Sequence, residues 1–126
     1  MTLGPKCGGC PLQRIGSGYA AVDGTGRSGV VIVAEALGED EARLGHNLVG
    51  KAGQFTQRML TRTRDPETQQ PLEWDDFYRT NIIRCRPPNN ELTGASYEFG
   101  ALAHCRPYLE DFLLRTRPKA WAAGGR

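Results

Sequence analysis

Long apolar runs are missing from this chain of 126 residues, and their absence excludes the usual kind of membrane protein. A membrane-spanning helix needs ~20 consecutive apolar residues, and no stretch of the sequence approaches that length. The N-terminus carries a single lysine and no apolar run, so it lacks the pattern of a secretory signal peptide. We therefore expect a cytoplasmic protein without a membrane partner.

An excess of one sign of charge is missing too. The net charge is +2, which is too small by itself to indicate binding to nucleic acid. The arginines nevertheless come in three groups: Arg58, Arg62 and Arg64; Arg79, Arg84 and Arg86; Arg106, Arg115 and Arg117. Solvated helix faces explain such groups at least as readily as a DNA partner does.

Short β-branched and aromatic runs predict the strands. Val30–Ala34 is bounded by glycine and is typical of a strand buried on both faces of a parallel sheet. Phe77–Ile83 is a second strand candidate, and Lys119–Ala123 reads as the opening of a third. Glycine-rich or irregular loops are expected at Gly16–Gly29 and at Glu35–Lys51.

Two helices are expected between these strands. One begins near Ala52 and continues through Leu60. The other extends from about Ser96 to Arg115, and Pro107 is expected to kink it or to divide it in two. Strands that alternate with helices predict an α/β layer fold around a parallel sheet, formed by one domain over residues 1–126.

The four cysteines indicate a metal site before they indicate disulfides, because the expected compartment is reducing. Cys7 and Cys10 form a Cys-x-x-Cys turn that points both sulfurs at one centre. Cys85 and Cys105 complete a shell of four thiolates if the fold brings them to the same place. Zinc and an iron–sulfur cluster both accept such a shell. Four unrelated buried thiols are the remaining interpretation.

An acidic segment, Glu35–Glu41, follows the first predicted strand. Ligands of parallel α/β sheets bind at the carboxyl edge of the strands, so a carboxylate there is a candidate catalytic group. Nearby glycines let the backbone approach a ligand closely. An acidic surface loop explains the same residues equally well.

Several short motifs follow one another from Cys7 to the end of the chain. They are Cys7-x-x-Cys10-Pro11-Leu12, Val33-Ala34-Glu35-Ala36-Leu37-Gly38, Leu48-Val49-Gly50-Lys51-Ala52-Gly53, Thr80-Asn81-Ile82-Ile83-Arg84-Cys85-Arg86-Pro87-Pro88 and Cys105-Arg106-Pro107-Tyr108-Leu109. Together they resemble the N-terminal portion of the family 4 (iron–sulfur) uracil-DNA glycosylases, and residues 89–95 look most like the phage-type branch.

This resemblance implies a three-layer αβα fold with a short parallel sheet, whose C-terminal part is truncated here. It implies a protein of base excision repair that hydrolyses the N-glycosidic bond of flipped-out uracil in DNA. It also implies a 4Fe-4S cluster with a structural role, held by Cys7, Cys10, Cys85 and Cys105; zinc is the alternative.

The resemblance further implies roles for individual residues. Glu35 is the catalytic carboxylate, which orients or deprotonates water or stabilises the sugar cation. Asn81 reads the Watson–Crick edge of uracil, since a carboxamide offers both a donor and an acceptor. The other implied uracil-binding residues are Ala36, Gly38 and Leu48. The implied DNA-binding residues are Lys51, Gln54, Arg86, Pro87, Pro88 and Asn90; the first two lie at a predicted helix start, where N–H groups favour phosphate.

The sequence departs from the family pattern at several positions. The family usually has other residues at Ala34, Leu37, Ala42 and Glu91, and an aromatic at Leu48 that stacks on the base. Its second catalytic motif, His-Pro-Ser, lies beyond the end of this chain, and neither His46 nor His104 matches it. An unfinished sheet has an open edge, so a homodimer or a separate C-terminal partner chain is expected.

Two alternatives to the enzyme remain on sequence grounds. One is a catalytically inactive iron–sulfur module that keeps the fold and binds DNA. The other is a zinc-binding structural domain with an acidic loop.

Overall fold

The computed structural model describes residues 7–123. Three parallel strands alternate with helices along the chain. The elements are α1 (Leu12–Ile15), β1 (Val30–Ala36), α2 (Glu39–Leu44), α3 (Lys51–Leu60), the 3-10 turn η1 (Trp74–Asp76), β2 (Tyr78–Ile83), the 3-10 turn η2 (Pro88–Asn90), α4 (Glu98–Thr116) and β3 (Ala120–Ala123). Within the part of the chain described, no helix is both long and apolar enough to cross a membrane.

The sheet has the strand order β2-β1-β3, and both neighbours run parallel to β1. β1 is central because its residues 31–34 are buried, so the strand needs cover on both faces. The register places Ala34 opposite Asn81 and Ala36 opposite Ile83. The residues after position 34 of β1 and position 81 of β2 therefore emerge together at one edge of the sheet.

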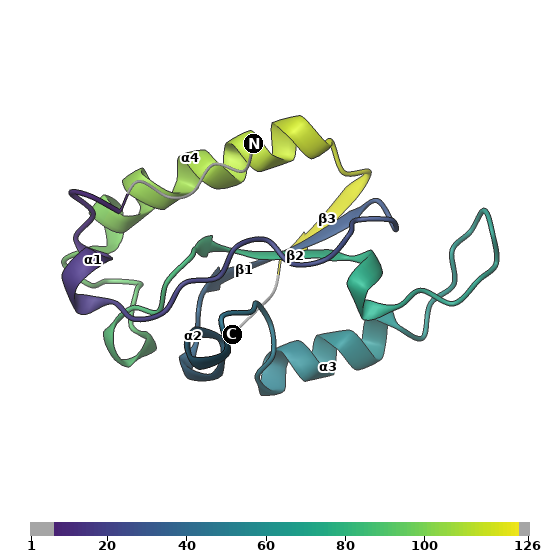
Figure 1. Ribbon diagram of the computed structural model, residues 1–126, viewed down its shortest axis with the longest axis horizontal. Coiled ribbons are helices and arrows are strands. Elements are labelled where there is room, and N and C mark those ends of the chain that lie inside the picture. The colour runs from purple at the N-terminus through teal and green to yellow at the C-terminus, as the bar shows by residue number, and fades with distance from the viewer. Residues whose placement is uncertain (1–6, 124–126) are drawn as a thin grey trace.

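Helices cover both faces of the sheet, which makes the fold a three-layer αβα arrangement (Figure 1). α4 lies on one face, where Val31 and Val33 pack with Phe112. α2 and α3 lie on the other face, where Ile32 and Ala34 pack with Leu48. The alternation of these β1 residues between the two faces follows the two-residue period of a strand. The α/β fold expected from the sequence is thus confirmed.

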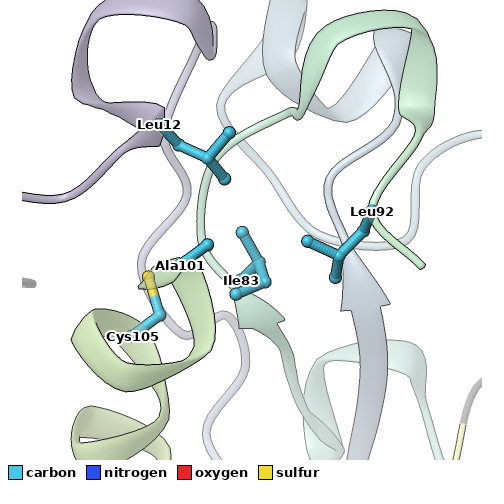
Figure 2. Packing of buried hydrophobic residues seen from close by; sticks show 5 residues of the cluster. All are labelled: Leu12, Ile83, Leu92, Ala101 and Cys105. Atoms are coloured by element: carbon cyan, nitrogen blue, oxygen red, sulfur yellow. The ribbon is translucent and has the colours of Figure 1, made fainter. Parts of the chain in front are cut away.

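A third cluster of apolar side chains closes the end of the molecule near α1. Leu12, Ile83, Leu92, Ala101 and Cys105 form it, and they come from α1, β2, the loop after η2, and α4 (Figure 2). Cys10 and Cys85 pack against the same cluster. Cysteines far apart in the sequence are thereby brought to one place.

The predicted loop at Gly16–Gly29 contains an ordered stretch that runs antiparallel to β2. Ser17 and Arg86 exchange two backbone hydrogen bonds of 3.0 and 2.8 Å, and Asp23 and Arg79 exchange two of 2.9 and 2.8 Å. Residues 17–23, which we call the edge segment, therefore occupy the free edge of β2. No alternating apolar pattern marks this segment, because it contributes mainly backbone hydrogen bonds.

Two other expectations about local structure are corrected: the loop at Glu35–Lys51 and the division of the last helix at Pro107. The predicted loop at Glu35–Lys51 contains α2, which has three acidic residues in its first turn and ends at Gly45 in the left-handed conformation. Pro107 does not divide α4, which is one continuous helix. Pro107 is exposed, and the buried side of α4 is formed by other residues, so packing on the sheet holds the helix together across the proline.

Candidate active site and cysteine cavity

A cavity of about 390 Å³ opens at the carboxyl ends of β1 and β2. In open parallel sheets this is the edge where ligands bind. We call it the strand-end pocket. Its lining residues come from β1 and the turn after it, α2, the start of α3, β2 and η2: Ala34, Glu35, Ala36, Leu37, Gly38, Glu39, Asp40, Glu41, Leu48, Gly50, Lys51, Ala52, Gly53, Asn81 and Asn90.

The structure gathers most of the residues that the sequence singled out. Glu35, Ala36, Gly38, Leu48, Lys51, Asn81 and Asn90 all line the strand-end pocket. Gln54, Arg86, Pro87 and Pro88 are described but do not line it. Gln54 instead donates from Nε2 to the carbonyl of Val49 at 3.0 Å, and Arg86 donates from Nε to Oδ1 of Asn90 at 2.7 Å. Arg86 thus contacts a lining residue while staying outside the pocket.

Glu35 lies near the end of β1 and is partly buried. The hydroxyl of Thr93 donates to its Oε1 at 3.1 Å. Thr93 is 58 residues away in the chain, and no spacing in the sequence links the two. This contact ties the loop after η2 to the carboxylate at the pocket.

Leu48 is held in a left-handed backbone conformation, with φ of 58°. Such a conformation is uncommon for a residue other than glycine, and it persists where surrounding structure enforces it. Gly53 permits it, because a Cβ at Gly53 would lie only 2.0 Å from the carbonyl oxygen of Leu48. The side chain of Leu48 is 8% exposed and forms an apolar wall of the pocket.

Glu41 is a second carboxylate that organises the pocket, and no sequence pattern indicated this role. Its Oε2 accepts hydrogen bonds from the backbone N–H groups of Val49 and Gly50, the latter being the N-cap of α3. The negative charge at the start of α3 is therefore supplied by the protein itself. A phosphate that approaches Lys51 there would meet a carboxylate next to the helix end, which makes this helix end less favourable for phosphate than the sequence implied.

Asn81 is 1% exposed, and Asn47 beside it is fully buried. Nδ2 of Asn81 donates to Oδ1 of Asn47 at 2.7 Å. Oδ1 of Asn81 has no hydrogen-bond partner among the described residues. The sequence pointed to Asn81 but not to Asn47, because the partners of Asn47 are all distant in the chain: Ala21, Asp23 and Asn81.

Asp23 completes this network from the edge segment. Its carboxylate accepts from the backbone and side chain of Asn47 and contacts Nδ1 of His46 at 2.9 Å. Burial raises the pKa of Asp23, but the hydrogen bonds from Asn47 and His46 outweigh burial and leave the pKa below its usual range. Asp23 is therefore a charged carboxylate at neutral pH.

The four cysteines line a second cavity, of about 240 Å³, which we call the cysteine cavity. Burial and the neighbouring cysteines raise the pKa of Cys85 to about 12. Burial also raises the pKa of Cys105, although a hydrogen bond from the backbone of Arg84 opposes this effect. Protein alone thus disfavours the thiolate forms that metal binding requires, and a bound cation reverses that preference.

Arg84 lines the same cavity and is only 3% exposed. Its guanidinium carbon lies 5.9 Å from the centre of the Tyr108 ring. Nε of Arg84 has no hydrogen-bond partner in residues 7–123, and no carboxylate in that range forms an ion pair with it. A buried cation is costly unless an anion compensates it. A four-thiolate metal group is such an anion, so the residues present fit one.

Four thiols around one cavity can serve more than one kind of metal group. Among the described residues, no three His, Cys, Asp or Glu side chains are arranged to hold a single metal ion. Four cysteines around one cavity nevertheless suit a cluster of several irons, in which the thiolates bind different metal atoms. A single tetrahedral zinc ion is the other metal group that four thiolates hold.

The sequence matches a known protein family over most of its length. The model of the uracil DNA glycosylase superfamily matches residues 22–126. The chain is similar to the type-4 uracil-DNA glycosylase of Pyrobaculum aerophilum, with 33% identity over 120 residues, covering 95% of this chain and 56% of that protein. For the type-4 enzyme of Archaeoglobus fulgidus the identity is 33% over 122 residues, covering 96% and 55%.

The type-4 uracil-DNA glycosylase of Sulfurisphaera tokodaii is similar as well, with 30% identity over 121 residues, covering 96% of this chain and 50% of that protein. The chain spans about half the length of these curated relatives.

Proposed function

Because the chain belongs to the uracil-DNA glycosylase superfamily, we propose that it binds DNA and hydrolyses the N-glycosidic bond of a uracil flipped out of the helix. The observation that carries this proposal is the strand-end pocket, which brings Glu35 and Asn81 together from two adjacent strands. An enzyme that acts on a base must take it out of the stack, and a concave site with a polar floor receives it.

Glu35 and Asn81 divide the chemistry between them. Asn81 offers an acceptor and a donor to the edge of the base. Glu35 orients a water molecule and takes its proton while the water oxygen bonds to C1′ of the sugar. The C1′–N1 bond breaks, and its electron pair leaves with the uracil. Leu48 forms an apolar wall for the ring, and the backbone around Ala36 and Gly38 approaches the base closely.

DNA contact is proposed to surround the mouth of this pocket. Lys51 is exposed at the start of α3 and supplies positive charge at the rim. Arg86 and Asn90, which are hydrogen-bonded to each other, extend this rim along η2 with Pro87 and Pro88. Gln54 is exposed on the first turns of α3, outside the pocket lining, and is the last of the proposed contacts.

We further propose that Cys7, Cys10, Cys85 and Cys105 hold a 4Fe-4S cluster, for which the buried Arg84 supplies compensating charge. When bound, this group joins the N-terminal turn, the end of β2 and α4 into one unit. Its role is structural, since the cysteine cavity and the strand-end pocket have no lining residue in common.

The edge of β3 is where we propose that a second copy or a separate C-terminal partner chain adds to the sheet. All four residues of β3 are exposed, and Trp121 is 66% exposed. Sedimentation of the purified chain tests this proposal. A monomer that remains monomeric at high concentration contradicts the homodimer.

The decisive experiment is uracil excision from a single-stranded oligonucleotide by anaerobically purified protein. Glu35→Gln is expected to lower the rate by about 10²- to 10⁴-fold, because it removes the proton acceptor but keeps the side-chain volume. Glu67→Gln is the matched control, since Glu67 is an exposed carboxylate outside the pocket. Equal loss in both variants, or no excision by folded wild-type protein, contradicts the proposal.

A further inference from the structure

Asn47 has every polar group of its side chain engaged, although it is fully buried. Its Nδ2 donates to the carbonyl of Ala21 at 2.6 Å and to Oδ2 of Asp23 at 2.8 Å. Its backbone N–H also donates to Oδ2 of Asp23, at 2.7 Å. Its Oδ1 accepts from Nδ2 of Asn81 at 2.7 Å.

These contacts allow only one orientation of the Asn47 carboxamide. If it were turned by 180°, its oxygen would face the carbonyl of Ala21 and the carboxylate of Asp23, which are both acceptors. The lowered pKa of Asp23 keeps that carboxylate charged and therefore keeps it an acceptor. Oδ1 of Asn47 consequently always faces Asn81.

The orientation of Asn47 in turn fixes that of Asn81. Turning the Asn81 carboxamide by 180° would bring its oxygen to within hydrogen-bond distance of Oδ1 of Asn47, where two acceptors repel. Asn81 is therefore held with Nδ2 toward Asn47. Its Oδ1, which has no partner among residues 7–123, and the second N–H of Nδ2 are left for a ligand.

An acceptor and a donor in this fixed order match one base and mismatch another. Uracil presents a donor at N3–H and an acceptor at O4, whereas cytosine presents an acceptor at N3 and a donor at N4. A freely turning carboxamide accommodates both patterns. A fixed one leaves buried polar groups unpaired when cytosine binds, which is the strongest basis for discrimination in such sites.

We propose that Asn47, oriented by Asp23, is the positioning residue that fixes the Asn81 carboxamide and thereby sets the selection of uracil over cytosine. This inference rests on the proposed function, because it assigns the specificity of the same pocket. It adds two residues to the site, and both act through Asn81 and not by touching the base.

The test measures binding of free uracil, cytosine and N3-methyluracil to the full 126-residue chain by titration. Wild-type protein is expected to bind uracil at least about 100-fold more tightly than either of the others, since both lack the N3–H donor. Asn47→Ala is expected to reduce the uracil-to-cytosine ratio to within about 5-fold, chiefly through tighter cytosine binding. Loss of a residue with only a structural role lowers the affinity for all three ligands together and leaves the uracil-to-cytosine ratio unchanged.

Two further variants keep the test sharp. Asn47→Leu keeps most of the side-chain volume and is measured if Asn47→Ala does not fold; the same fall in ratio is expected. Gln70→Ala is the control, because Gln70 is an exposed carboxamide outside the pocket, and its ratio should equal that of wild type.

The outcomes separate the two proposals. If the wild type selects and excises uracil while both Asn47 variants retain the full ratio, this inference is overturned and the proposed function stands. If folded wild type neither binds nor excises uracil, the proposed function fails and this inference fails with it. Wild-type protein that binds cytosine as tightly as uracil overturns the inference without any variant.

Discussion

The strand-end pocket and the cysteine cavity lie at the same end of the sheet, yet their polar groups are satisfied in different ways. At the strand-end pocket, the lining residue Glu41 and the network of Asn47 and Asp23 behind Asn81 make hydrogen bonds within the protein. One buried oxygen, Oδ1 of Asn81, has no partner among the described residues. In the cysteine cavity, two thiols have raised pKa values and the Arg84 cation lacks an anionic partner in that same range.

This difference indicates that the strand-end pocket is preorganised and the cysteine cavity is not. The pocket is shaped by internal hydrogen bonds, so a ligand meets groups that are already oriented. The cysteine cavity instead places one cation among four thiols, and thiolates bound to a metal group would supply the negative charge that the Arg84 cation lacks. The fold is therefore expected to depend strongly on what fills the cavity and only weakly on what fills the pocket.

Cys105→Ser is expected to have the largest effect on stability, because it removes a residue of the cysteine cavity. The variant should lose its iron and its visible absorbance, and the free energy of unfolding should fall by at least about 3 kcal/mol, because metal binding contributes directly to folding. Iron analysis and denaturant unfolding measure both. Arg106→Ala, at an exposed neighbouring position of α4, should change stability by less than about 0.5 kcal/mol. Full iron content in Cys105→Ser contradicts the assignment of this ligand.

Asn81→Ala should affect activity and leave the cavity intact. Removing the carboxamide is expected to lower kcat/KM for uracil excision by about 10²- to 10³-fold, as for the loss of one preorganised hydrogen-bonding group. Iron content should equal that of wild type, since Asn81 does not line the cysteine cavity. A parallel loss of iron would show that the two regions are not separate.

Gly53→Ala tests the backbone that shapes the pocket wall. Glycine to alanine inside a helix normally stabilises a protein by about 1 kcal/mol. Here the sign should be reversed, with a loss of about 2–4 kcal/mol, because the added Cβ would meet the Leu48 carbonyl at 2.0 Å. Thermal unfolding measures the effect. Any gain in stability would mean that Leu48 can leave its left-handed conformation without cost.

Acid should lower the free energy of unfolding through Asp23, by less than the substitutions above. The folded state lowers the pKa of this carboxylate, so its contribution to stability is complete above the unfolded value of about 4 and is lost as the pH falls through the lower folded value. Denaturant midpoints of wild type and Asp23→Asn, measured between about pH 2 and pH 6, test this. The wild type should lose more stability than the variant across that range, and identical profiles would contradict it.

The sequence predicted the elements whose patterns are local. β1, β2 and the helix from about residue 52 to 60 were found because β-branched runs and helical periodicity depend on neighbouring residues. Glu35 was placed at the carboxyl end of the first predicted strand and Asn81 in the second, and the parallel pairing of these strands brings the two residues to one edge of the sheet. The observed edge of the sheet follows from that rule alone.

What the sequence could not predict depends on contacts between distant residues. Asn47 is ordinary as a single residue, and its role arises only when Asp23 and Asn81 reach it from separate segments. The edge segment was interpreted as a loop because backbone pairing leaves no side-chain pattern. α2 was missed because an exposed helix of six residues, with no buried side chain, has no apolar face to detect.

The edge segment also determines at which edge the sheet can accept another strand. Because residues 17–23 already pair with the backbone of Arg79 in β2 and of Arg84 and Arg86 just after it, a strand from any source cannot pair along this side without displacing them. β3, on the opposite side of β1, has all four of its residues exposed. Within residues 7–123 the sheet is thus open to extension beside β3, and a parallel addition there needs a crossover connection of its own.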